Sequence, residues 1–247
     1  MSKQSKSAVG VNEISAEVLH PADVEARLIA AAATGRNDIF MKYKLVLWDF
    51  DGTLADTLSV ALDVYNQLAA KKGFKPVEDP FAVRDMSMSE FLKSHGIPAH
   101  RVPFAFSAFL KQVRSQASDV SLMDGVAELV PKISELGLQQ GVISSNSTDN
   151  IQQCLTANQI ARHFQFLKGT SRIFGKESTI RATIKQAGLV AEQVLYVGDE
   201  IRDIDAARAA GVDIACVTWG LNSAKALLRH NPDHVIANAG DLLDILA

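Results

Sequence analysis

The sequence predicts an α/β protein with a Rossmann-like parallel sheet as its core and a small helical cap domain inserted after the first strand. Three observations carry this prediction. An apolar run at 45–48 ends abruptly in two carboxylates, a glycine and a hydroxyl, as a buried parallel strand followed by a turn would. Residues from about 58 to 119 show helical patterns broken by prolines and no convincing strand. From about residue 121, strand and helix patterns alternate at the spacing of βαβ units.

The elements of the predicted core follow one another in a regular order. A helix after the first strand ends at Gly73, where a glycine terminates the apolar periodicity. Beyond the insert, the pattern predicts helices at 126–136, around 151–155, 176–188, 201–210 and 241–246, and strands at 140–146, 164–167, 194–197, 213–217 and 234–237.

Domain boundaries follow from these patterns. We expect the core at 41–57 and 120–247 and the helical cap at 58–119. Residues 1–40 form an N-terminal extension, which we expect to be partly disordered around one partial helical stripe that includes Val18, Val24 and Leu28. That helix either packs on the surface of the domain or docks a partner, and the protein is expected to be a monomer or homodimer.

Composition excludes several classes of protein. A hydrophobic content of 47% in 247 residues is enough for a sizeable core. The net charge of -3 argues against a nucleic-acid partner, because proteins that bind nucleic acids normally carry a basic stripe. Two cysteines, Cys154 and Cys216, are too few for a disulfide framework. No apolar run could span a bilayer and no signal peptide opens the chain, so we expect a cytoplasmic protein without a membrane partner.

The chemistry is expected where the strands stop, because ligands of open α/β sheets bind beyond the carboxyl ends of the strands. Asp49 and Asp51 follow the first strand two residues apart, so an extended backbone points both carboxylates the same way. Two like charges this close require a cation or a proton. The alternative is a polar turn without a function.

Three further polar clusters fall at later strand ends or helix starts. Each has a structural alternative: the hydroxyls of 144–146 could cap a helix, Lys176 could be solvated, and Asp199 with Asp203 could complement a helix dipole. A dipole effect does not explain a second carboxylate cluster at the same edge of the sheet. Oxygen ligands of this kind are those that Mg²⁺ prefers.

Taken together and in this order, the clusters resemble the four motifs of the haloacid dehalogenase-like hydrolase superfamily. These are Asp-Phe-Asp-Gly-Thr-Leu from Asp49, a strand-end serine, a later lysine, and Gly-Asp-(three residues)-Asp from Gly198. The resemblance covers roughly residues 41 to 247. A helical insert after the first motif is similar to the first cap class of the superfamily. The stretch 218–222 and the general layout look most like phosphoglycolate phosphatases.

The resemblance implies a phosphoric monoester hydrolase. It implies a Mg²⁺-dependent phosphatase that cleaves a small phosphorylated metabolite, similar to phosphoglycolate, through an aspartyl-phosphate. Asp49 matches the nucleophile and Asp51 the general acid/base. The residues matching the phosphate-binding positions are Ser145, followed by Asn146, with Ser144 as a one-residue register alternative, and Lys176.

The same resemblance implies a metal site. Asp49, the backbone carbonyl of Asp51 and Asp199 would be direct ligands of Mg²⁺, and Asp203 would orient a metal-bound water or Lys176. The cap would read the leaving group, with candidate readers Arg84, His95, His100, Arg101 and Arg114, each of which could equally be a solvated surface residue. A phosphoglucomutase-like phosphotransferase and a non-catalytic partner-binding protein of the same fold remain the alternatives.

Overall fold

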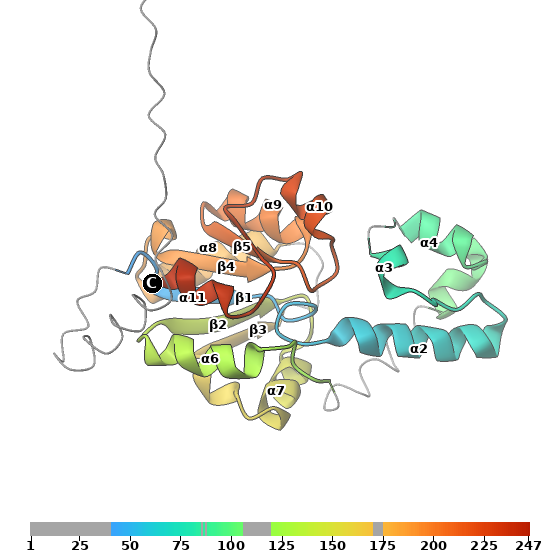
Figure 1. The fold of residues 1–247 in the computed structure, drawn as a ribbon, viewed down its shortest axis with the longest axis horizontal. Helices are drawn as coiled ribbons and strands as arrows, with labels where there is room; N and C mark the ends of the chain where they lie inside the picture. Colours follow the sequence, from blue (N-terminus) through green and yellow to red (C-terminus); the bar gives the residue numbers. More distant parts are fainter. Residues whose placement is uncertain (1–40, 85, 87, 106–119, 170–174) are drawn as a thin grey trace, which may run out of the picture.

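The core of the protein is a six-stranded parallel sheet with helices on both faces (Figure 1). The computed structural model describes residues 41–84, 86, 88–105, 120–169 and 175–247. The strand order is β3-β2-β1-β4-β5-β6, and every neighbouring pair is parallel. The strands are β1 (Leu45–Trp48), β2 (Gln139–Ser144), β3 (Phe166–Gly169), β4 (Val194–Gly198), β5 (Asp213–Val217) and β6 (His234–Ile236). The predicted Rossmann-like α/β fold is confirmed.

Alternating side chains of β1 divide the core into two layers. Val46 and Trp48 pack in one apolar cluster, and Leu45 and Leu47 pack in the other, because successive residues of a strand point to opposite faces. The first cluster includes residues from α6 (Val126–Glu135), α7 (Thr148–Ala157) and α11 (Asp241–Leu246). The second includes residues from α8 (Lys176–Ala187), α9 (Ile201–Ala210) and α10 (Ala224–Leu228). Burial on both faces explains why β1 reads as a continuous apolar run.

A helical segment lies between β1 and β2 in sequence and to one side of the sheet in space (Figure 1). Its described part contains α2 (Thr57–Lys72), α3 (Pro80–Val83), α4 (Met88–Ser94) and the short 3-10 turn η1 (Ala99–Arg101), and no strand. The Asp56 carboxylate caps α2 by accepting a hydrogen bond from the backbone N–H of Ser59 at 3.1 Å. Gly73, with a φ of 73°, ends the helix in the left-handed conformation that glycine permits.

Two predicted strands differ in their bounds. β2 ends at Ser144 rather than at residue 146, and β3 begins at Phe166 rather than at residue 164. The pairing of β2 with β3 sets these limits, since Gly141 lies opposite Phe166. A Cβ on Gly141 would lie 2.1 Å from the Phe166 ring, so the glycine leaves room for that ring. Such a register depends on a distant partner and leaves no local pattern.

Other elements complete the core. Ser223 caps α10, a helix that the periodicity did not predict, by accepting from the Ala226 N–H at 3.2 Å. Two 3-10 turns, η3 (Ala161–His163) and η4 (Ala191–Gln193), precede β3 and β4. The predicted N-terminal helix within 1–40, and residues 106–119 of the predicted insert, lie outside the described residues.

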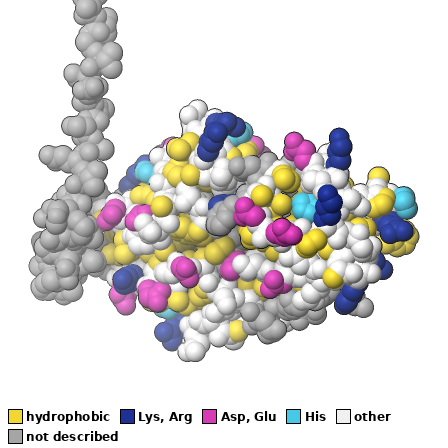
Figure 2. All heavy atoms as spheres, turned by 45° about the vertical axis from the view of Figure 1, so that its right-hand side comes forward, with side chains coloured by type: hydrophobic (Ala, Val, Ile, Leu, Met, Phe, Trp, Pro, Cys, Tyr) yellow, Lys and Arg dark blue, Asp and Glu magenta, His cyan; other side chains and the backbone are white. Residues whose placement is uncertain are grey.

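Charged side chains of both signs are interspersed over the face seen in Figure 2, in keeping with the small net charge. Among the helices in the described ranges, none has the length and apolar character to cross a membrane.

Candidate active site

Three aspartates meet at the carboxyl edge of the sheet. Asp49 follows β1 and Asp199 follows β4, two adjacent strands between which the order of the sheet reverses. Asp203 lies in the first turn of α9, directly after β4. One carboxylate oxygen from each of the three lies within 4.8 Å of the others, and the three side chains are at most 1% exposed. The strand-end clusters predicted from sequence therefore form one buried site at the switch point of the sheet.

One oxygen of Asp49 accepts a backbone hydrogen bond, and the other accepts no hydrogen bond from the described residues. The backbone N–H of Asp49 donates to the Val197 carbonyl at 2.8 Å, so β1 and β4 stay paired up to the site. Asp49 Oδ1 accepts a hydrogen bond from the Phe50 N–H at 2.8 Å. Asp49 Oδ2 is buried without a hydrogen-bond partner among the described residues. A buried carboxylate oxygen that accepts no hydrogen bond and is compensated by a nearby lysine charge points to a further ligand or a reacting atom.

Lys176 supplies the cation nearest to this oxygen. It begins α8, and its Nζ lies 2.9 Å from Asp49 Oδ2 and 2.6 Å from Asp203 Oδ1. Burial opposes the charge of Lys176, but these two carboxylates outweigh it and hold the pKa of the ammonium well above its ordinary value. Asp203 also accepts from the Glu200 N–H at 3.1 Å, so its side chain is engaged on both oxygens. Lys176 is therefore a fixed positive charge beside Asp49.

Asp199 is held by one hydroxyl and one backbone amide. Its Oδ1 accepts from Thr53 Oγ1 at 2.7 Å, and its Oδ2 accepts from the Leu221 N–H at 2.6 Å. Two glycines allow the backbone to approach Asp199. A Cβ added to Gly52 would lie 2.5 Å from Asp199 Oδ2, and a Cβ added to Gly220 would lie 2.3 Å from the Cβ of Asp199. Burial, followed by the negative charges of Asp203 and Asp49, raises the pKa of the Asp199 carboxyl well above its ordinary value.

The close approach of Gly220 yields a prediction. Gly220→Ala should displace Asp199 or the loop that carries Gly220, and it should lower the free energy of unfolding by about 1–3 kcal/mol because the added methyl has no space. Gly240→Ala is the matched control, since a Cβ there meets nothing within 4 Å and its φ is -61°. Thermal denaturation of both variants tests this. Equal melting temperatures would contradict the crowding at Gly220.

Asp51 is oriented by residues of the β2–α7 turn. Its Oδ1 accepts from Asn146 Nδ2 at 2.9 Å, and its Oδ2 accepts from Ser144 Oγ at 3.3 Å. Burial and then the neighbouring Asp49 raise the pKa of the Asp51 carboxyl, while the hydrogen bonds from Asn146, Thr57 and Ser144 partly offset that rise. A raised pKa keeps a larger fraction of Asp51 protonated, which is the form that can donate a proton.

The residues predicted to bind phosphate lie around these carboxylates but in different surroundings. The Asn146 side chain faces Asp51 and is itself fixed by the Ser147 N–H and by Asn150 Nδ2, at 2.8 and 3.0 Å from its Oδ1. The Ser145 hydroxyl is half-buried and makes no hydrogen bond within the described part of the chain. Contact of Ser145, Asn146 and Lys176 with phosphate stays a prediction.

The donor set fits a hard divalent cation. Three carboxylates and one lysine leave an excess of negative charge in a buried space, and Asp49 Oδ2 accepts no hydrogen bond from the described residues although Lys176 Nζ lies 2.9 Å away. Oxygen-only ligands suit Mg²⁺-like ions rather than zinc, which takes nitrogen and sulfur ligands. The geometry thus supports a cation held by Asp49 and Asp199.

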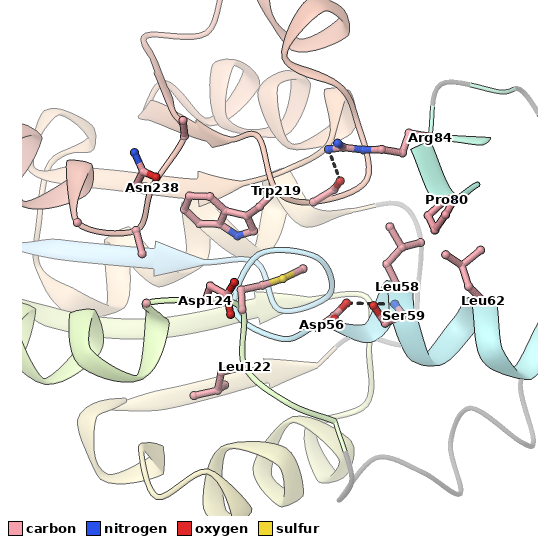
Figure 3. Close-up of a pocket in the computed structure, with 16 residues that line it drawn as sticks. Asp56, Leu58, Ser59, Leu62, Pro80, Arg84, Leu122, Asp124, Trp219 and Asn238 are labelled. Carbon is pink, nitrogen blue, oxygen red and sulfur yellow. Dashed lines mark hydrogen bonds between the residues drawn. The ribbon is translucent and has the colours of Figure 1, made fainter. Parts of the chain in front are cut away.

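A cavity of about 720 Å³ opens beside this site, between the start of α2 and the core (Figure 3). Leu58 and Leu62 of α2 line one side, and Trp219 and Asn238 line the other. Neither Asp49 nor Asp51 is among the described residues that line it. The cavity therefore lies at the junction between the helical segment and the core and is distinct from the carboxylate cluster.

The candidate readers of the leaving group have separate environments. Arg84 reaches across to the loop after β5, where it donates to backbone carbonyls. His95 is 8% exposed and stacks on Phe91 with ring centroids 4.2 Å apart, so it belongs to the interior of the helical segment. His100 and Arg101 are exposed, and Arg114 lies outside the described residues. None of the described readers contacts the carboxylates.

Sequence reasoning missed two groups that hold Asp199. Thr53 could have been found, because it is a hydroxyl in the turn that carries Asp49 and Asp51. Leu221 acts through its backbone N–H, which no side-chain pattern marks.

Comparison with known proteins places these features in a family. A family model described as haloacid dehalogenase-like hydrolase matches residues 46–217. A phosphoglycolate phosphatase from Synechococcus elongatus is 30% identical over 204 residues, covering 80% of this chain and 94% of that relative. An N-acetylmuramic acid 6-phosphate phosphatase from Pseudomonas aeruginosa is 26% identical over 217 residues, covering 83% of this chain and 96% of that relative.

Solved structures agree on the fold. A crystal structure described as a predicted phosphoglycolate phosphatase from Haemophilus somnus matches with a TM-score of 0.70 at 21% identity, covering 84% of this chain and all of that chain. At this identity the likeness speaks for the fold alone. The family model and the sequence relatives confirm the predicted resemblance and the predicted enzyme class, a phosphoric monoester hydrolase.

Proposed function

The chain belongs to the haloacid dehalogenase-like hydrolase family, and from that premise we propose that it is a Mg²⁺-dependent phosphatase for small phosphate monoesters similar to phosphoglycolate. The observation that carries the proposal is Asp49 Oδ2, a buried carboxylate oxygen without a hydrogen-bond partner among the described residues, 2.9 Å from Lys176. A phosphatase needs a nucleophile placed beside positive charge that neutralises the phosphate oxygens.

In the proposed reaction, Asp49 Oδ2 attacks the phosphorus, a P–O bond to Asp49 forms, and the bond to the leaving oxygen breaks. Asp51 donates its proton to the leaving alkoxide. Asp51 then takes a proton from water, whose oxygen attacks the phosphorus while the bond to Asp49 breaks. Both carboxyl groups return to their starting state, and inorganic phosphate is released.

The other side chains bind and orient. Lys176 would hold a phosphate oxygen as a point charge, while Asp203 keeps the ammonium in place at 2.6 Å. The Ser145 hydroxyl is available for a second phosphate oxygen, and Asn146 and Ser144 aim Asp51. Asp49, Asp199 and the Asp51 carbonyl would hold Mg²⁺, which when bound screens the negative charge of phosphate and carboxylates. Asp203 would orient Lys176 or a metal-bound water.

We further propose that residues 58–119 act as a cap that closes over the site and reads the leaving group. α2 starts six residues after Asp51, so this segment is attached directly beside the proposed site. The substrate is then expected to be small, because the carboxylates are buried and the leaving group must fit between core and cap.

A panel of phosphate monoesters tests the proposal directly. Purified protein should release phosphate from p-nitrophenyl phosphate and from one or more small metabolites, with 2-phosphoglycolate and N-acetylmuramic acid 6-phosphate included. Activity should disappear in EDTA and return with added Mg²⁺. Turnover that requires a sugar bisphosphate would identify a phosphotransferase instead. No turnover of any ester in Mg²⁺ would refute the enzyme.

Asp199→Asn provides the matched control for the metal. The amide can still accept from the Leu221 N–H and donate to Thr53 Oγ1, so the local hydrogen bonds survive while the charge is lost. Mg²⁺ should raise the melting temperature of the wild type, because at a concentration 100 times the Kd it adds about 2.7 kcal/mol to the free energy of unfolding. It should leave the variant unchanged. An equal shift in both proteins would remove Asp199 from the metal site.

A further inference from the structure

Arg84 of the helical segment makes hydrogen bonds to a loop of the core. It follows α3, and its guanidinium reaches the loop after β5, residues 218–222 (Figure 3). Four backbone carbonyls of this loop accept hydrogen bonds from Arg84. Its Nη2 donates to Thr218 O at 2.8 Å, to Asn222 O at 3.0 Å and to Gly220 O, and its Nε donates to Leu221 O at 3.2 Å. Carbonyls converging on one cation make a site that is built for a guanidinium.

The same loop holds Asp199 from its other side. The Leu221 N–H donates to Asp199 Oδ2 at 2.6 Å, and the Asn222 N–H donates to the Asp199 backbone carbonyl at 3.3 Å. The Asn222 side chain accepts from the Ile201 N–H at 3.0 Å and so reaches the start of α9. The backbones of Leu221 and Asn222 are therefore held from both sides. Their carbonyls accept from Arg84, and their N–H groups donate to Asp199.

A cavity borders this loop on the side that faces the helical segment. Arg84, Trp219 and Gly220 line the cavity of about 720 Å³ that separates α2 from the core. Where a cavity replaces packed side chains, the position of a loop depends on its hydrogen bonds. Trp219 adds one such bond, from its Nε1 to the Thr53 carbonyl at 3.1 Å, and Thr53 in turn contacts Asp199.

We propose that Arg84 is a positioning residue that docks the helical segment onto loop 218–222 and, through the Leu221 N–H, holds Asp199 in its orientation. Withdrawal of the helical segment then loosens Asp199, and its docking tightens it. The affinity of the site for a cation is then higher when the helical segment is in place. The catalytic consequence rests on the proposed function, whereas the docking itself does not.

Hydrogen exchange in the metal-free protein tests the docking without any assay of activity. In Arg84→Ala, the amides of Leu221 and Asn222 should exchange about tenfold faster or more, because their carbonyl side is released. The β4 amides should keep their wild-type rates. Arg229→Ala is the matched control: it removes the same charge from an exposed position seven residues beyond the loop. Unchanged exchange at Leu221 and Asn222 in Arg84→Ala would overturn the proposal.

Arg84→Lys separates charge from geometry. Arginine donates here from two nitrogens, Nη2 and Nε, whereas an ammonium donates from one atom. Lysine should therefore lose the contact that Nε makes with the Leu221 carbonyl, and exchange should lie between the wild type and Arg84→Ala. This variant also keeps the test decisive if Arg84→Ala fails to fold. Exchange in Arg84→Lys equal to that of the wild type would show that charge alone suffices and would overturn the proposed geometry.

Binding of Mg²⁺ measured by calorimetry supplies the second readout. Its Kd should rise about tenfold in Arg84→Ala and stay unchanged in Arg229→Ala. Faster exchange with no phosphatase activity in the wild type would uphold the docking and refute the proposed function. Normal turnover by the wild type, with exchange and Kd unchanged in Arg84→Ala, would uphold the proposed function and refute the docking.

Discussion

Asp49→Asn should lower phosphate release by roughly a thousandfold or more, because it removes the attacking oxygen. Asparagine can still accept the hydrogen bond from the Phe50 N–H, and Lys176 keeps its contact with Asp203 at 2.6 Å. The pairing of β1 with β4 through the Asp49 N–H also survives, since it uses the backbone. The fold should therefore remain intact while turnover is lost.

Steady-state hydrolysis of p-nitrophenyl phosphate measures this loss, and circular dichroism with thermal denaturation verifies the fold. Asp149→Asn is the control, because Asp149 is an exposed aspartate in the first turn of α7 and lies outside the carboxylate cluster. It should retain wild-type activity. Appreciable hydrolysis by purified Asp49→Asn would remove Asp49 from the role of nucleophile.

The predictability of the site from sequence depends on which group of a residue does the work. Asp49, Asp199 and Asp203 were expected together because charged side chains at strand ends must converge once the sheet is parallel. The strand order β3-β2-β1-β4-β5-β6 then brings Asp49 and Asp199 to neighbouring strands. Side-chain chemistry and topology were sufficient here.

Backbone contacts escaped the same reasoning. Arg84 binds carbonyls 134 to 138 residues away, and a carbonyl carries no residue type that could reveal a partner. Leu221 likewise serves Asp199 by its N–H. From sequence, Arg84 was one of several cap residues that could face the substrate. Its observed partners depend on how the helical segment meets the core, which local patterns do not encode.

The β2–α7 turn shows a third case, in which the residue types were identified but their directions were not. The pattern Ser144-Ser145-Asn146 indicates polar groups at a strand end. It does not tell which of them faces the phosphate site and which faces Asp51. β2 ends at Ser144, and this places the hydroxyl of Ser144 and the amide of Asn146 on Asp51. Strand ends are set by pairing with neighbours, so this distinction needs the three-dimensional register.

The role of Asp51 is tested by the dependence of rate on the leaving group. Asp51→Asn should slow hydrolysis of an alkyl phosphate by roughly 10²–10⁴-fold, the usual contribution of a general acid or base. Asparagine preserves the shape of the side chain and can still pair with Asn146 and Ser144. The loss therefore reports the proton and not the packing.

With p-nitrophenyl phosphate the same variant should behave differently. The nitrophenolate leaves without a proton, so Asp49 can still form the aspartyl-phosphate and release one equivalent of nitrophenol in a rapid burst. The next step needs a base to deprotonate water, and Asp51→Asn lacks it, so steady-state turnover should stall after the burst. Rapid-mixing absorbance measures the burst amplitude per site. Near-normal steady-state rates with an alkyl phosphate would exclude Asp51 as the proton donor. The proton would then have to come from a group other than the carboxyl that Asn146 and Ser144 hold.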